Sequence, residues 1–144
     1  MAKNTGKPSE KIFETAITRL GKQAWYLRLV DASEIVGRTK VISSSVRAQP
    51  CDYILVIRGH TEFAEVKSSV DSRAFRFSLL RTGQTAQAQM IVSAGGDYMI
   101  YVHALDTDTW YRFPYGVVDH YKHAGHSSIP WPELESFKWN IPTT

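Results

Sequence analysis

Two carboxylates and a lysine, Asp52, Glu65 and Lys67, lie at one end of a predicted pair of strands. Apolar runs on either side of Arg58-Gly59 predict two strands joined by a turn. Side chains alternate between faces along a strand, so Glu65 and Lys67 share a face while Val66 points to the other. Carboxylate oxygens bind hard divalent cations, and such a cation beside a lysine suits phosphodiester hydrolysis.

The length of the turn decides which residue lies opposite Asp52. With the two-residue turn Arg58-Gly59, Asp52 lies across from Glu65. With a four-residue turn ending at Thr61, Asp52 faces Lys67 instead. In both registers the three charges share one face. Two opposed carboxylates repel each other unless a cation lies between them, so both registers predict a divalent-metal site.

The composition is that of a soluble globular protein. The 144 residues have the length of one domain, and 43% are hydrophobic and 22% charged. No apolar run approaches the length of a membrane span, and the polar, basic N-terminus has no apolar secretory core. The single Cys51 excludes an internal disulfide and predicts a small core residue, with a functional thiol as the alternative. We expect no membrane partner and a location in the cytoplasm of a bacterial or phage-infected cell.

Charge is distributed unevenly along the chain. Residues 1–81 hold 14 Lys and Arg against 8 Asp and Glu, whereas residues 82–144 hold 3 against 6. The basic excess therefore lies in the half that carries the predicted strand pair. It fits a phosphate-binding face, and it equally fits a solvated surface of uneven charge.

Hydrophobic periodicity predicts a single domain over residues 1–144, with helices and strands in alternation. Helices are expected over 8–20 and 84–94, strands over 24–30, 98–103 and 110–113, and short helical stretches over 115–122 and 131–136. With the central strand pair, the order is helix, three strands, helix, strand. This order predicts an α/β fold with a mixed sheet flanked by helices.

The three charged residues and the element order match the general pattern of the PD-(D/E)xK nucleases, whose core is αβββαβ. Further segments resemble, in the same order, those of the RecU-type Holliday junction resolvases. They are Asp52-Tyr53, Arg58-Gly59, Glu65-Val66-Lys67, Gln84 opening a helix that ends at Gly95-Gly96, and Ser128 to Trp131. One departure is that Cys51 separates the motif's proline, Pro50, from Asp52.

The resemblance implies a restriction-endonuclease-like fold and a Mg²⁺ or Mn²⁺ cofactor. The implied metal ligands are Asp52, Glu65 and the carbonyl of Val66, with Glu10 as a third carboxylate. Lys67 would orient the attacking water or stabilise the developing charge on the phosphate. Glu14, one helical turn after Glu10, is the alternative carboxylate, and Glu10 itself could instead complement the helix macrodipole.

The resemblance also implies a four-way DNA junction as substrate and a homodimer as the assembly. Phosphate contacts are expected from a short basic stalk or arm at about 34–48, from the loop after the strand pair, and from the next helix. The residues are Arg38, Lys40, Arg47, Arg73, Arg76, Arg81 and Gln84. Two alternatives stay open here: Phe75 and Phe77 could simply anchor the loop, and Gln84 could cap its helix.

Other functions also fit the sequence. One is a nuclease of the same fold that acts on ordinary duplex or damaged DNA, and another is a non-catalytic DNA-binding module. His120, His123 and His126 admit a zinc site, although a basic surface loop suits them better. The four tryptophans are expected in the core or at a subunit interface.

Overall fold

The computed structural model describes residues 6–30 and 49–142. Its centre is a five-stranded mixed sheet with the strand order β1-β2-β3-β5-β6. Within this sheet β3 and β5 are parallel, and the other neighbouring strands are antiparallel. The strands are β1 (Ala24–Arg28), β2 (Tyr53–Ile57), β3 (His60–Ser69), β5 (Tyr98–Ala104) and β6 (Thr109–Pro114).

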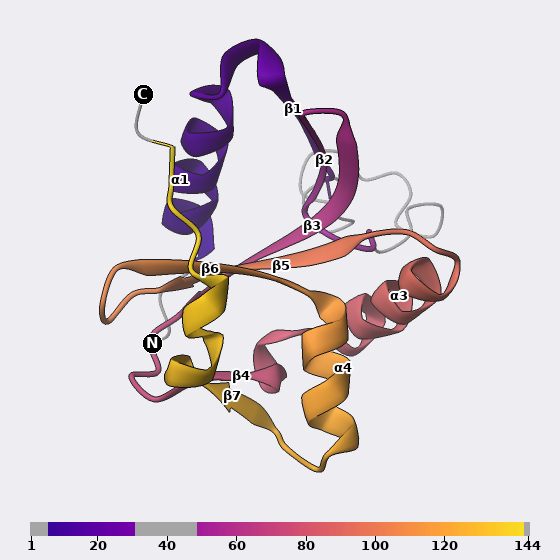
Figure 1. Ribbon diagram of the computed structural model, residues 1–144, viewed down its shortest axis with the longest axis vertical. Helices are drawn as coiled ribbons and strands as arrows, with labels where there is room; N and C mark the ends of the chain where they lie inside the picture. Colours follow the sequence, from indigo (N-terminus) through magenta and orange to yellow (C-terminus); the bar gives the residue numbers. More distant parts are fainter. Residues whose placement is uncertain (1–5, 31–48, 143–144) are drawn as a thin grey trace, which may run out of the picture.

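Helices cover both faces of the sheet (Figure 1). The helix α1 (Gly6–Thr18) lies on one face, and α3 (Thr82–Ser93) and α4 (Tyr115–His123) lie on the other. A small second sheet pairs β4 (Ala74–Arg76) with β7 (Ser128–Pro130) on the side of α3 and α4. The predicted α/β class and the predicted order of helix, three strands, helix, strand are both confirmed.

Short 3₁₀ helices complete the described part of the chain. They are η1 (Gly21–Gln23), η3 (Phe77–Leu79) and η4 (Trp131–Phe137). The last of these and α4 confirm the short helical stretches expected over 131–136 and 115–122. None of the helices in the described ranges is long and apolar enough to cross a membrane.

Two hydrophobic cores hold these layers together. On the α1 side, Phe13 and Ile17 pack against Tyr53, Leu55 and the apolar residues beside them in the sheet. The opposite core contains buried side chains of β5, β6, α4, η3 and β4. Every residue of β5 is buried, because this strand lies between two neighbours and under both layers. This position explains its nearly continuous apolar sequence.

The β2–β3 hairpin has the two-residue turn. Ile57 pairs with His60, and both turn residues have positive φ, 50° for Arg58 and 83° for Gly59. Two successive positive φ angles are typical of a type I′ turn, whose twist matches that of the strands it joins. The register continues to the pair of Tyr53 with Ala64, so the two-residue register is confirmed.

Two features of the structure were not predicted from the sequence. The basic segment from Ser68 to Gly83 contains β4 and η3, although its short apolar stretches carry no strand signal. On β1, Trp25 and Leu27 are exposed, because α1 packs against the other face of this edge strand, which carries Tyr26. The predicted stalk at 34–48, with Arg38, Lys40 and Arg47, lies outside the described residues.

Candidate active site

The open end of the β2–β3 hairpin brings Asp52 and Glu65 together. The Asp52 N–H donates to the Ala64 carbonyl at 3.1 Å, and Asp52 Oδ2 accepts from the Val66 N–H at 2.8 Å. Asp52 thus bonds the residues on both sides of Glu65. Its side chain takes the place of a backbone acceptor just before β2 begins. This geometry fixes the first carboxylate directly across from the second.

Lys67 lies on the same face and contacts Glu65. Lys67 Nζ is 2.9 Å from Glu65 Oε2, and the Glu65 side chain is completely buried. Despite this proximity, neither carboxylate oxygen of Glu65 has a hydrogen bond of good geometry within the described residues. Oε1 therefore has no donor among the described residues, and a buried acceptor of this kind commonly marks a place where a ligand binds.

Burial and mutual repulsion disfavour the ionised forms of both acids. The pKa of Glu65 is raised to about 7, first by burial and then by the charge of Asp52, while Lys67 opposes the shift. The pKa of Asp52 is also raised, chiefly by burial, against the opposing effect of the Val66 N–H. A fully buried and a half-buried carboxylate, both with raised pKa values, are typical of a site that binds a cation.

These residues fit a divalent metal ion. Asp52 and Glu65 supply carboxylate oxygens, the ligands that Mg²⁺ and Mn²⁺ prefer. In a strand, the N–H and C=O of one residue point to the same side, so the Val66 carbonyl also faces the side of Asp52. Such an ion would satisfy the open oxygens of Glu65 and relieve the repulsion between the two acids.

A third carboxylate ligand is not assembled among the described residues, which hold no group of three or more His, Cys, Asp and Glu placed for a metal. Glu14 is bound elsewhere, since its carboxylate accepts hydrogen bonds from the hydroxyls of Tyr26 at 3.3 Å and Tyr53 at 2.5 Å. Glu10 lies beyond the first turn of α1, where the macrodipole effect declines. Its role as a ligand stays a prediction.

A buried tyrosine supports the segment that leads into the site. The Tyr98 hydroxyl donates to the Pro50 carbonyl at 2.6 Å, and Tyr98 pairs with Phe63 across the β3–β5 junction. The intervening Cys51 is buried, and burial raises the pKa of its thiol to about 12. Cys51 is therefore a core residue and no reactive thiolate, as predicted. No local pattern marks Tyr98 as important, because its hydroxyl bonds a backbone atom far away in the chain.

Two of the predicted DNA-contacting residues lie at the start of α3. Arg81 is close enough to Asp52 to favour its ionised form. Gln84 caps the helix, since its Oε1 accepts from the Arg81 N–H at 3.2 Å. The capping interpretation of Gln84 is thus confirmed, and a DNA contact from its amide nitrogen stays a prediction.

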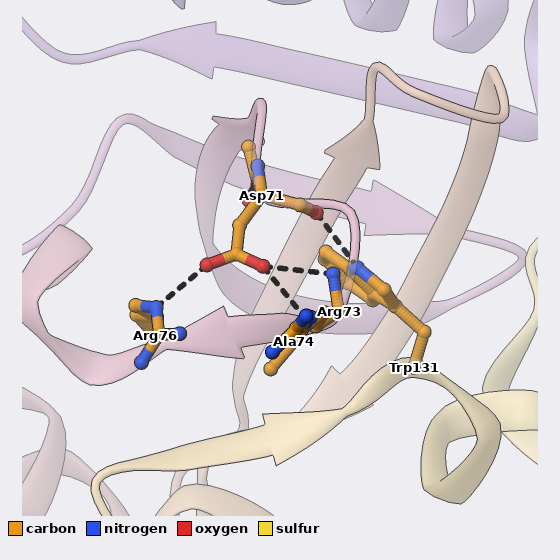
Figure 2. A network of polar contacts seen from close by, with 6 residues as sticks. Asp71, Arg73, Ala74, Arg76 and Trp131 are labelled. Carbon is orange, nitrogen blue, oxygen red and sulfur yellow. Dashed lines mark hydrogen bonds and ion pairs between the residues drawn. The ribbon is translucent and has the colours of Figure 1, made fainter.

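Arg73 and Arg76 lie on the loop and strand between β3 and α3, around an acid that the sequence analysis missed (Figure 2). Asp71 Oδ2 accepts from Arg76 Nε at 2.6 Å, and Asp71 Oδ1 accepts from the backbone of Arg73 and Ala74. The only local signal was an Asp two residues before an Arg-Ala pair, a spacing common in Asx turns. Phe75 and Phe77 are buried, so they anchor this segment to the core.

The remaining candidates are structural or exposed. His120, His123 and His126 are exposed and take part in no metal-binding group of the described residues. Trp110 is buried, Trp139 packs against the α1-side core, and Trp131 stacks on Tyr111 at 5.2 Å between ring centroids. Trp25 is 54% exposed, which leaves a subunit interface as its predicted role.

Comparisons with known proteins found similar architectures among solved structures. The chain is similar to Hjc of Archaeoglobus fulgidus, a Holliday junction resolvase from an archaeal hyperthermophile, with a TM-score of 0.48 and 13% identity. The similarity covers 77% of this chain and 73% of that one. No family model and no curated protein sequence matches the chain.

Proposed function

We propose that this protein is a metal-dependent DNA endonuclease that cleaves four-way junctions. The observation that carries the proposal is the hairpin end, where a fully buried glutamate without good hydrogen bonds lies opposite an aspartate and beside a lysine. A purely structural ion pair would not need the second, repelling carboxylate. The arrangement suits metal-assisted hydrolysis of a phosphodiester.

Each residue has a distinct role in this chemistry. Asp52, Glu65 and the carbonyl of Val66 would hold Mg²⁺ or Mn²⁺, with Glu10 as a further ligand. The bound ion would lower the pKa of a coordinated water and offset negative charge at the scissile phosphate. Lys67, largely buried and held by Glu65, keeps its ammonium at a fixed place, where it can donate to the attacking water or to a phosphate oxygen.

The substrate has to approach the face of the sheet on which Glu65 and Lys67 lie. Arg81 is near Asp52 at one end of the β3–α3 connection, and Lys67 is near its other end. Arg73 and Arg76 lie between them in the sequence, so three arginines follow the site along the chain. We infer that they bind phosphates on either side of the cleaved bond.

A second copy of the chain would provide the second cut of a four-way junction. Trp25 and Leu27 are 54% and 46% exposed on the edge strand β1. They pair with Val56 and Ile54 of β2 and share their face, which gives an apolar strip on the sheet side away from α1. An apolar strip of this kind suits a subunit interface of two-fold symmetry.

A cleavage assay tests the proposed function. Labelled four-way junction, linear duplex and single strand are incubated with the protein in Mg²⁺, Mn²⁺ or EDTA. We expect paired nicks in the junction with metal only, and a loss of at least about a hundredfold for Asp52→Asn and Glu65→Gln. Glu135→Gln is the matched control, because Glu135 also contacts a lysine at 2.9 Å but is exposed on η4.

The same assay separates the alternative functions. Equal cleavage of duplex and junction would replace junction selectivity by a general DNA nuclease of this fold. Junction binding without cleavage in either metal would indicate a non-catalytic DNA-binding module. Full activity of Glu65→Gln would contradict the proposed active site itself.

A further inference from the structure

The segment after β3 is held by an acid with two separate functions. Asp71 follows the end of β3 by two residues, and its N–H donates to Ser69 Oγ at 3.2 Å. Its Oδ1 accepts from the N–H groups of Arg73 at 2.8 Å and Ala74 at 3.1 Å. These bonds form an Asx-type turn that starts β4. One carboxylate oxygen therefore shapes the backbone, and the other stays available for a side chain.

Trp131 fixes the same segment from a distant part of the chain. Its Nε1–H donates to the Asp71 carbonyl at 2.9 Å (Figure 2). Its backbone N–H donates to the Arg73 carbonyl at 3.1 Å. The pairing of β4 with β7 places Trp131 beside this turn. With bonds on both sides of the turn, the position of the Asp71 carboxylate is determined by the fold.

The second oxygen of this carboxylate orients an arginine that faces solvent. Asp71 Oδ2 accepts from Arg76 Nε at 2.6 Å, and the Arg76 side chain is 53% exposed. Its sequence neighbours Phe75 and Phe77 are buried, whereas the Arg76 side chain is exposed to solvent. Neither terminal nitrogen of Arg76 has a hydrogen-bond partner within residues 6–30 and 49–142. The guanidinium is thus held at Nε with its donor fork free.

We propose that Asp71 is a positioning residue that presents the Arg76 guanidinium to a phosphate of the bound DNA. This inference rests on the proposed function, because it assigns a role within the same nucleic-acid interface. Arginine recognises phosphate through paired N–H donors, and a guanidinium held in place loses less side-chain freedom on binding. The carboxylate at Nε leaves both terminal nitrogens for the phosphate.

A different role for Asp71, simple neutralisation of Arg76, predicts the opposite change in DNA affinity. If Asp71 simply neutralised Arg76, removing its charge would strengthen DNA binding and steepen the salt dependence. If Asp71 positions Arg76, the same change would weaken binding. Asp71→Asn suits the test, because the amide oxygen can still accept from the Arg73 and Ala74 backbone while the amide nitrogen cannot accept from Arg76.

The experiment measures junction binding by the full chain in Ca²⁺ over a range of salt concentrations. We expect Asp71→Asn and Arg76→Ala each to weaken binding roughly tenfold and to reduce the salt slope by about one. The double variant should bind no more weakly than Arg76→Ala alone, because both changes remove one contact. Glu135→Gln, which also frees a cation from its acid, should bind as the wild type does.

Three results would overturn the inference. They are unchanged or tighter binding by Asp71→Asn, a further tenfold loss when Asp71→Asn is added to Arg76→Ala, and normal binding by Arg76→Ala. If the wild type binds and cleaves junctions while any of these is seen, only the role of Asp71 is wrong. If the wild type binds no DNA at all, the proposed function is wrong and the inference falls with it.

Discussion

Two buried glutamates on β3 show how a binding carboxylate differs from a structural one. Glu62 is 1% exposed, and both its oxygens are bonded, Oε1 to Arg112 at 2.7 Å and Oε2 to the Tyr101 hydroxyl at 2.9 Å. Glu65 is equally buried, yet within the described residues Oε1 has no hydrogen-bond partner, and Oε2 contacts only the Lys67 ammonium at 2.9 Å. The fold thus provides hydrogen-bond partners for both oxygens of Glu62, whereas the described part of the chain provides none for Oε1 of Glu65.

The raised pKa of Glu65 predicts a pH effect on stability. Its folded pKa of about 7 exceeds the unfolded value near 4.5, so the fold favours the protonated form. This favourable contribution is complete below pH 4.5 and is lost as the pH rises through 7. In EDTA, the free energy of unfolding of the wild type should therefore fall by about 3 kcal/mol more than that of Glu65→Gln between pH 4.5 and 8.

Chemical denaturation at several pH values measures this difference between the two proteins. Addition of Mg²⁺ at pH 8 should stabilise the wild type and leave Glu65→Gln nearly unchanged, since the ion binds only the folded wild-type site. If the free energies of unfolding of the two proteins change equally with pH in the absence of metal, the fold does not raise the pKa of Glu65.

At the scale of elements, the hairpin turn determines whether the site exists. A one-residue change of register would move Asp52 away from Glu65 and turn its side chain to the other face. The register depends on Gly59, whose φ of 83° is accessible to other residues only with strain.

Gly59→Ala should therefore destabilise the protein by about 1–2 kcal/mol, even though a methyl group there meets no atom within 4 Å. Gly116→Ala, in the first turn of α4, is the control, because it also has open space but no positive φ. We expect that variant to be neutral or slightly stabilised. Thermal unfolding of both checks the prediction, and equal effects would show that turn strain is unimportant.

The hairpin was predictable from the sequence because its pairing is local. Arg58-Gly59 lies between two apolar runs, and the register follows from the turn. The β4–β7 sheet was not predictable, because each strand has three residues and the partners are separated by a helix, two strands and another helix. Asp52, Glu65 and Lys67 were predictable as one group because they lie on this local hairpin. The contacts of Tyr98 and Trp131 were not predictable, because they join residues far apart in the chain.

At the scale of the whole molecule, an apolar strip remains on the sheet beside the site. Trp25 and Leu27 lie on the edge strand and face away from α1, which covers the other side of β1. The sequence alternation identified this strand but not its exposed face, since that face depends on where α1 packs. A homodimer would cover the strip and place two copies of the proposed active site in one assembly.

A single charged substitution in the apolar strip tests the proposed dimer. We expect the wild type to sediment as a dimer and Trp25→Glu as a monomer, because a buried unpaired carboxylate opposes association. Ile12→Glu is the control, since Ile12 is 40% exposed on α1, on the opposite side of the sheet. Sedimentation velocity over a range of concentrations gives the answer. A monomeric wild type, or a dimeric Trp25→Glu variant, would rule out this interface.

The parallel pairing of β3 with β5 also sets an order of assembly. The β2–β3 hairpin closes through contacts near in sequence, whereas β4 and α3 lie between β3 and β5 in the chain. Loop-closure entropy favours the local step first. Glu65 pairs with Ile100 of β5, so its carboxylate keeps water until that strand docks. We therefore expect the cost of dehydrating the proposed nuclease centre to fall on the late steps of folding, after the hairpin that carries it has formed.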